Sequence, residues 1–83
     1  MYVLLGLNKS HDGEASVYLY GVYGEMFDAR KEMKRVYKDL LEEERSYYED
    51  AEGEIISSRA TIYGQHTDMH LKILDDSDRS YKF

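Results

Sequence analysis

The period of the hydrophobic pattern changes twice along this 83-residue chain, and that change restricts its fold more than any other feature. Residues 2–8 are apolar strand formers, and residues 15–23 alternate with period two. Across residues 25–51, apolar side chains recur at spacings of three, four and seven, as in an amphipathic helix. Alternation then returns in 54–63 and 67–74. The pattern predicts the order strand, strand, helix, strand, strand.

Short polar or glycine-containing segments separate these elements. Asp12-Gly13 is a strong hairpin signal, Gly24 breaks the second strand, Gly53 ends the helix, and Gly64-Gln65-His66 forms a turn. The economical fold is α+β, ββαββ, with a four-stranded, mostly antiparallel sheet and one long helix packed on one face. Residues 1–74 are expected to form a single domain, and residues 75–83 a charged C-terminal tail.

Strand alternation predicts which side chains face the helix. We expect Met69, Leu71 and Ile73 to point inward, together with Val17 and Leu19. A set rich in tyrosine then points away, on a face that one helix leaves uncovered. Tyrosine combines a large contact area with a polar tip, so this face is predicted to bind a partner or a second copy of the chain. Its residues are Tyr2, Tyr18, Tyr20, Arg59, Tyr63 and His70.

The charged residues of the helical segment are strongly segregated. Residues 30–38 are mainly basic and residues 39–54 are mainly acidic, which opposes the helix dipole. Two interpretations remain open: a solvated face, or a contact surface for a basic partner. The predicted partner-binding residues of this acidic half are Glu42, Glu43, Glu44, Tyr47, Tyr48, Glu49 and Asp50.

Composition and the motif search exclude several classes of function. Seventeen acidic residues against eleven basic ones give a net charge of −6, which disfavours direct nucleic-acid binding. There is no cysteine, hence no thiol nucleophile, and no phosphate-binding or catalytic motif is present. We therefore predict no catalytic residues, no cofactor and no metal site, and a protein that is not an enzyme. No segment is apolar over the length of a membrane span or a signal peptide, so we expect a cytoplasmic protein.

A family resemblance accompanies this pattern. A strand that ends in Gly21-Val22-Tyr23, followed by a turn residue and a helix with Ala29 near its first turn, resembles small uncharacterised bacterial and phage proteins of ββα type. The resemblance implies a fold and no assigned function.

The leading hypothesis is a small acidic, non-catalytic protein-interaction domain. In its sharper form, it is a phage or mobile-element inhibitor that docks on a basic nucleic-acid-binding surface of a host protein. A homodimer is a further expectation. The first alternative is a small dimeric enzyme or ligand-binding domain whose site at the subunit interface uses Arg59, Asp68 and His70. The second is a nucleic-acid binder that uses the tyrosine-rich sheet face.

Overall fold

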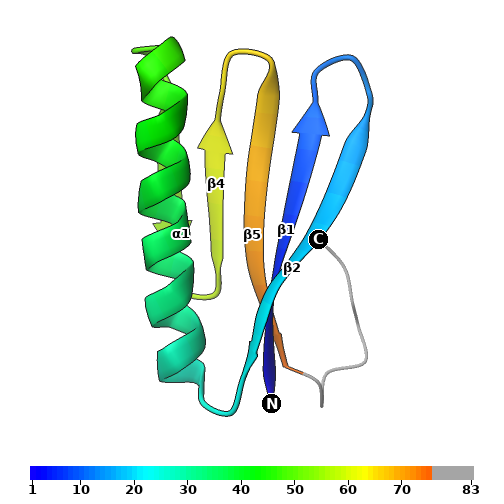
Figure 1. Ribbon diagram of the computed structural model, residues 1–83, viewed down its shortest axis with the longest axis vertical. Coiled ribbons are helices and arrows are strands. Elements are labelled where there is room, and N and C mark those ends of the chain that lie inside the picture. The colour runs from blue at the N-terminus through cyan, green and yellow to red at the C-terminus, as the bar shows by residue number, and fades with distance from the viewer. Residues whose placement is uncertain (76–83) are drawn as a thin grey trace.

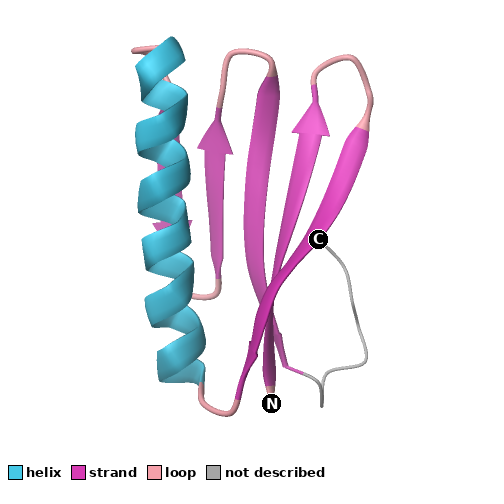
Figure 2. Cartoon of the chain, viewed as in Figure 1, coloured by secondary structure: helices cyan, strands magenta, loops and turns pink. Residues whose placement is uncertain are grey.

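The computed structural model describes residues 1–75, in which one helix lies against one five-stranded sheet (Figures 1 and 2). The elements are β1 (Tyr2–Ser10), β2 (Ala15–Tyr23), α1 (Met26–Tyr47), β3 (Glu52–Ile56), β4 (Arg59–Tyr63) and β5 (Thr67–Asp75). The predicted tail began at Asp75, which is the last residue of β5. The rest of that tail, residues 76–83, lies outside the described residues.

The strand order is β2-β1-β5-β4-β3, and each neighbouring pair is antiparallel. The first and last strands of the chain, β1 and β5, therefore lie side by side at the centre (Figure 1). β2 and β3 form the two edges, and α1 connects them across one face of the sheet. The predicted α+β class, with one helix on an antiparallel sheet, is confirmed.

The prediction of one strand over residues 54–63 is wrong. This segment is the hairpin of β3 and β4, which turns tightly at Ser57 and Ser58, so the described sheet has five strands instead of four. Ser57 adopts a positive φ of 50°, a left-handed conformation that serine seldom takes. Two-residue hairpin turns are usually marked by Asn-Gly, Asp-Gly or a leading glycine, and Ser-Ser carries no such signal.

The helix ends at Tyr47, earlier than the expected Ala51. The Arg45 Nε–H donates a hydrogen bond of 3.0 Å to the carbonyl oxygen of Ala51, and Ala51 is buried. These contacts close the turn that leads into β3. The predicted apolar stripe is confirmed, because Ala29, Met33 and Val36 pack as the buried side of the helix. They meet Leu4, Ala60, Leu71 and Ile73 of the sheet.

The predicted orientation of β2 is wrong over part of its length. Tyr18 lies opposite Gly6, whose strand neighbour two residues away is the core residue Leu4, so Tyr18 faces the helix side. The register of β1 and β2 shifts between Leu4 and Leu5, so that Leu4 pairs with Gly21 but Leu5 pairs with Leu19. The extra residue of β2 interrupts the alternation between Leu19 and Gly21, so the residues before it face opposite to what an unbroken alternation through Gly21, Val22 and Tyr23 would give. This pairing leaves Val17 and Leu19 exposed on the outer face, while Met69, Leu71 and Ile73 point inward as predicted.

Candidate functional site

A groove opens on the helix side of the sheet, near the C-terminal end of α1. Figure 1 shows the β1–β2 hairpin diverging from α1 toward this end, and a cavity of about 360 Å³ lies between them. This volume is within the range of about 300–1,000 Å³ that small-ligand sites occupy. The groove residues are Gly6, Leu7, Asn8, Tyr18, Tyr20, Leu40, Glu43, Glu44, Thr67, Met69, His70 and Leu71.

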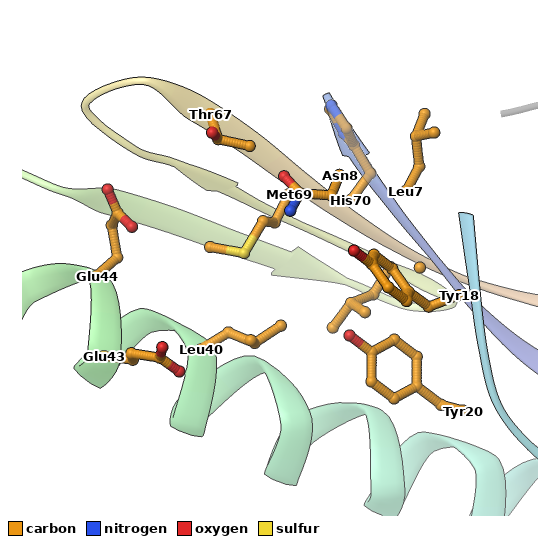
Figure 3. Close-up of a pocket in the computed structure, with 12 residues that line it drawn as sticks. Leu7, Asn8, Tyr18, Tyr20, Leu40, Glu43, Glu44, Thr67, Met69 and His70 are labelled. Atoms are coloured by element: carbon orange, nitrogen blue, oxygen red, sulfur yellow. The ribbon is translucent and has the colours of Figure 1, made fainter. Parts of the chain in front are cut away.

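Two tyrosines of β2 form one wall of the groove. Figure 3 shows the hydroxyl groups of Tyr18 and Tyr20 pointing into the space toward Leu40 and Met69. The Tyr20 ring lies over Gly6, where an added Cβ would be only 2.5 Å from the Tyr20 Cε2 atom. Burial raises the pKa of the Tyr20 phenol, and the neighbouring Tyr18 adds to the rise. The Tyr20 hydroxyl is therefore neutral near pH 7 and can both donate and accept hydrogen bonds.

The opposite wall carries two carboxylates of α1, Glu43 and Glu44 (Figure 3). The backbone N–H of Gln65 donates a hydrogen bond of 3.0 Å to Glu44 Oε1. A Cβ at Gly64 would lie 2.5 Å from the same oxygen, so the absence of a side chain there lets Glu44 reach the β4–β5 turn. This contact ties the end of the helix to the turn and holds the Glu44 carboxylate in place.

Polar and apolar side chains from the two central strands form the floor. Met69 and Thr67 of β5 lie beside Asn8 of β1 (Figure 3). The Asn8 Oδ1 atom is buried and accepts no hydrogen bond from the part of the chain that the structure describes. An unpaired buried acceptor costs free energy, about 1–3 kcal/mol in typical proteins.

The groove joins residues that the sequence placed on two separate surfaces. Tyr18 and Tyr20 were expected on the uncovered sheet face, and Glu43 and Glu44 on the acidic half of the helix. The other residues of the acidic half lie outside the groove. Glu42 and Tyr47 are exposed on α1, and Tyr48, Glu49 and Asp50 follow the helix.

The remaining members of the predicted tyrosine-rich face are divided between the two sides of the sheet. Tyr2 packs against the core on the helix side. Arg59, Tyr63 and His70 lie on the outer face, where the Tyr63 hydroxyl donates a hydrogen bond of 3.1 Å to Glu54 Oε1. His70 Nδ1 is 3.3 Å from the Thr61 hydroxyl oxygen. The fold therefore does not place all six predicted residues on one surface.

The outer face instead carries an aliphatic patch on β1 and β2, which we call the aliphatic surface. Cross-strand pairs join Leu5 to Leu19, Leu7 to Val17, and Val3 to Val22. Val17 and Leu19 are 63% and 64% exposed, although both were expected in the core. The members of the aliphatic surface are Val3, Leu5, Leu7, Val17, Leu19 and Val22.

Sequence reasoning missed the aliphatic surface and the floor of the groove for different reasons. Residues 2–7 form a continuous apolar run instead of an alternating one. Such a run is typical of a strand with apolar side chains on both faces, so it indicated the aliphatic surface. The floor residues Asn8, Thr67 and Met69 have no such signal. They line a groove only because α1 and the β1–β2 hairpin diverge above them.

Potential metal ligands and the residues of the enzyme alternative were located within the described part of the chain. Within residues 1–75, no three His, Asp or Glu side chains come together as metal ligands. Asp68 is a candidate in the enzyme alternative. Its Oδ1 atom lies 3.1 Å from the Nε2 atom of His11, which belongs to the β1–β2 loop.

Across residues 1–75, no helix is both long and apolar enough to cross a bilayer.

Residues 1–75 thus form an α+β fold of one helix and five strands, with a groove on one side of the sheet and an aliphatic surface on the other. No family model matches the sequence, and no similar curated protein or solved structure was found. The function is therefore inferred from the chain's own residues.

Proposed function

We propose that this protein is a small, non-catalytic protein-interaction domain that associates through the edge strand β2 and the aliphatic surface beside it. The observation that carries the proposal is the exposure of Val17, Leu19 and Val22, which lie together on an outer face that no other described element covers. Contiguous exposed aliphatic side chains are typical of interaction sites in soluble proteins.

The two edges of the sheet differ in a way that supports β2 as the contact strand. β2 contains no charged residue and no proline, so its outward backbone groups have little protection against pairing with another strand. The opposite edge, β3, carries Glu52 and Glu54. Charges on an edge strand discourage association with other chains, so the β3 edge is protected and the β2 edge is open.

The occupant that we propose for this surface is a second copy of the chain. A twofold axis close to Leu19, which lies at the middle of β2, would pair this strand antiparallel with its own copy. Such pairing satisfies the free backbone groups of both edges and brings the two aliphatic surfaces together at the junction. The contact is self-complementary, as twofold interfaces must be.

A lysine placed in the contact strand tests this proposal. Leu19→Lys should lower self-association by at least about tenfold, because pairing would then bury two like charges close to the twofold axis. Ile56→Lys is a matched control, since Ile56 is 63% exposed on the outer face of the other edge strand. Sedimentation equilibrium over a range of protein concentrations measures both variants and the wild type.

The expected result is a dimer for the wild type and for Ile56→Lys, and a monomer for Leu19→Lys. Thermal unfolding of each variant shows whether the monomer remains folded. A wild type that stays monomeric at every concentration, or equal weakening by the two lysines, would overturn the proposal.

A further inference from the structure

From the groove between α1 and the β1–β2 hairpin, we infer a binding site for an organic cation, an ammonium or guanidinium group carried on an apolar stem. This site opens on the helix side of the sheet, whereas the side chains of the aliphatic surface lie on the outer face, and Leu7 of β1 borders both. It therefore goes beyond the proposed self-association.

The charge of the groove selects the sign of its ligand. Glu43 and Glu44 supply carboxylates, and no lysine or arginine is among the groove residues. Glu44 is held at the wall by the hydrogen bond from the Gln65 N–H, so the carboxylate that faces the groove does not depend on a freely rotating side chain. A cation that enters gains two nearby negative charges in a partly enclosed space, where electrostatic attraction is stronger than in bulk water.

The hydrogen-bonding groups of the groove also favour a ligand rich in donors. Carboxylates accept only, and Glu43 and Glu44 supply two of them. Ammonium and guanidinium groups donate only. The phenol oxygens of Tyr18 and Tyr20, which point into the same space, are further acceptors (Figure 3).

The apolar part of the groove determines the rest of the ligand. Leu40 of α1 and Met69 of β5 lie between the tyrosine wall and the glutamate wall (Figure 3). A bare metal ion or a fully hydrated ion would leave these side chains without a partner. An alkyl stem of a few carbons would pack against them while its charged end reaches the carboxylates.

A short alkyl cation can come from a free amine or from a lysine or arginine side chain of a protein. The probes are n-butylammonium and n-butylguanidinium, with n-butanol as the neutral control at matched ionic strength. Backbone amide resonances of the full chain are followed by NMR during titration. We expect saturable shifts centred on Gly6, Asn8 and Thr67, and at least about tenfold weaker binding of n-butanol.

Two pairs of charge-removing substitutions separate the groove from general electrostatic attraction. The double variant Glu43→Gln with Glu44→Gln should weaken binding of the cations by at least about tenfold, while its amide oxygen can still accept from Gln65. The control, Glu42→Gln with Glu49→Gln, removes the same charge at exposed positions outside the groove, and should change binding by less than about twofold. Thermal unfolding confirms that both doubles remain folded.

An acetylated tripeptide with central arginine distinguishes the two sources of the cation. Binding as tight as that of n-butylguanidinium indicates a protein side chain, whereas binding of the small cations alone indicates a free amine. Equal loss in the two double variants, or shifts that do not saturate in the groove, would overturn the inference. Leu19→Lys should retain cation binding, so failure of the self-association proposal is distinguishable from failure of this one.

Discussion

At the scale of single residues, Tyr20 links the packing of the sheet to the chemistry of the groove. Its ring packs on Gly6, and this close approach requires glycine, since the side chain of any other residue at that position would collide with the ring. The partial burial that follows raises the pKa of its phenol. The pKa of Tyr63 is also raised, mainly because its hydroxyl donates a hydrogen bond to Glu54, and that of Tyr23 is raised by burial.

Because of these shifts, the free energy of unfolding should change with pH in the alkaline range. The folded pKa of Tyr20 lies above the ordinary value of 10.0, so the folded state retains a proton that the unfolded state loses. Its contribution to stability is fully present below pH 10 and is lost as the pH rises through the folded pKa. Tyr20→Phe keeps the ring on Gly6 and removes the ionisation.

The expected result for Tyr20→Phe is a shallower fall in the free energy of unfolding above pH 10 than in the wild type. Denaturant unfolding at a series of alkaline pH values measures the fall, and ultraviolet absorbance should show the loss of one late-ionising tyrosine. An identical pH slope in the two proteins would contradict the assigned burial of this phenol.

At the scale of elements, the turn between β3 and β4 decides the strand count. Ser57 holds its positive φ while its hydroxyl oxygen accepts a hydrogen bond of 3.2 Å from Arg30 Nη2. The carbonyl oxygen of Ser58 accepts a backbone hydrogen bond of 2.8 Å from Ile73. The turn is therefore supported both by the helix and by β5.

Substitution by glycine separates the two turn positions. Ser57→Gly should raise the free energy of unfolding by up to about 1 kcal/mol, because relief of the left-handed strain, which glycine does not have, outweighs the loss of the exposed hydrogen bond from Arg30. Ser58→Gly should lower it by about 0.5–1 kcal/mol, because Ser58 does not have a positive φ and glycine adds entropy to the unfolded chain. Urea unfolding of the two variants provides the measurement, and a stabilising Ser58→Gly would contradict this turn geometry.

At the scale of the whole molecule, β5 holds two hairpins together. It pairs with β1 on one side and with β4 on the other, and within residues 1–75 no other strand joins the β1–β2 hairpin to the β3–β4 hairpin. Leu71 lies at this junction, opposite both Gly6 and Ala60, and is almost completely buried. The two halves should therefore unfold together.

Leu71→Ala tests this cooperativity. Loss of its buried side chain should cost about 2–5 kcal/mol and lower the protection of both hairpins equally in hydrogen exchange. Ile56→Ala, at an exposed position of β3, should change stability by less than about 0.5 kcal/mol. Retained protection of one hairpin in Leu71→Ala would show that the halves fold independently.

The local pattern of side chains determined most of the secondary structure. The hairpin of residues 15–23 with the preceding strand, the apolar face of the helix and the inward positions of β5 all follow from periodicity. These features depend on residues close together in sequence, where the hydrophobic period separates an amphipathic helix from an alternating strand.

Only the tertiary structure decided which surfaces the protein presents. The pairing of β2 with β1, with its register shift between Leu4 and Leu5, sets Tyr18 and Tyr20 on the helix side and leaves Val17 and Leu19 outside. The strand order sets β2 at an open edge, and the angle between α1 and the β1–β2 hairpin brings Glu43 and Glu44 opposite the two tyrosines. Facing and proximity depend on pairing between residues far apart in the chain, and a single register shift reverses every later assignment in a strand.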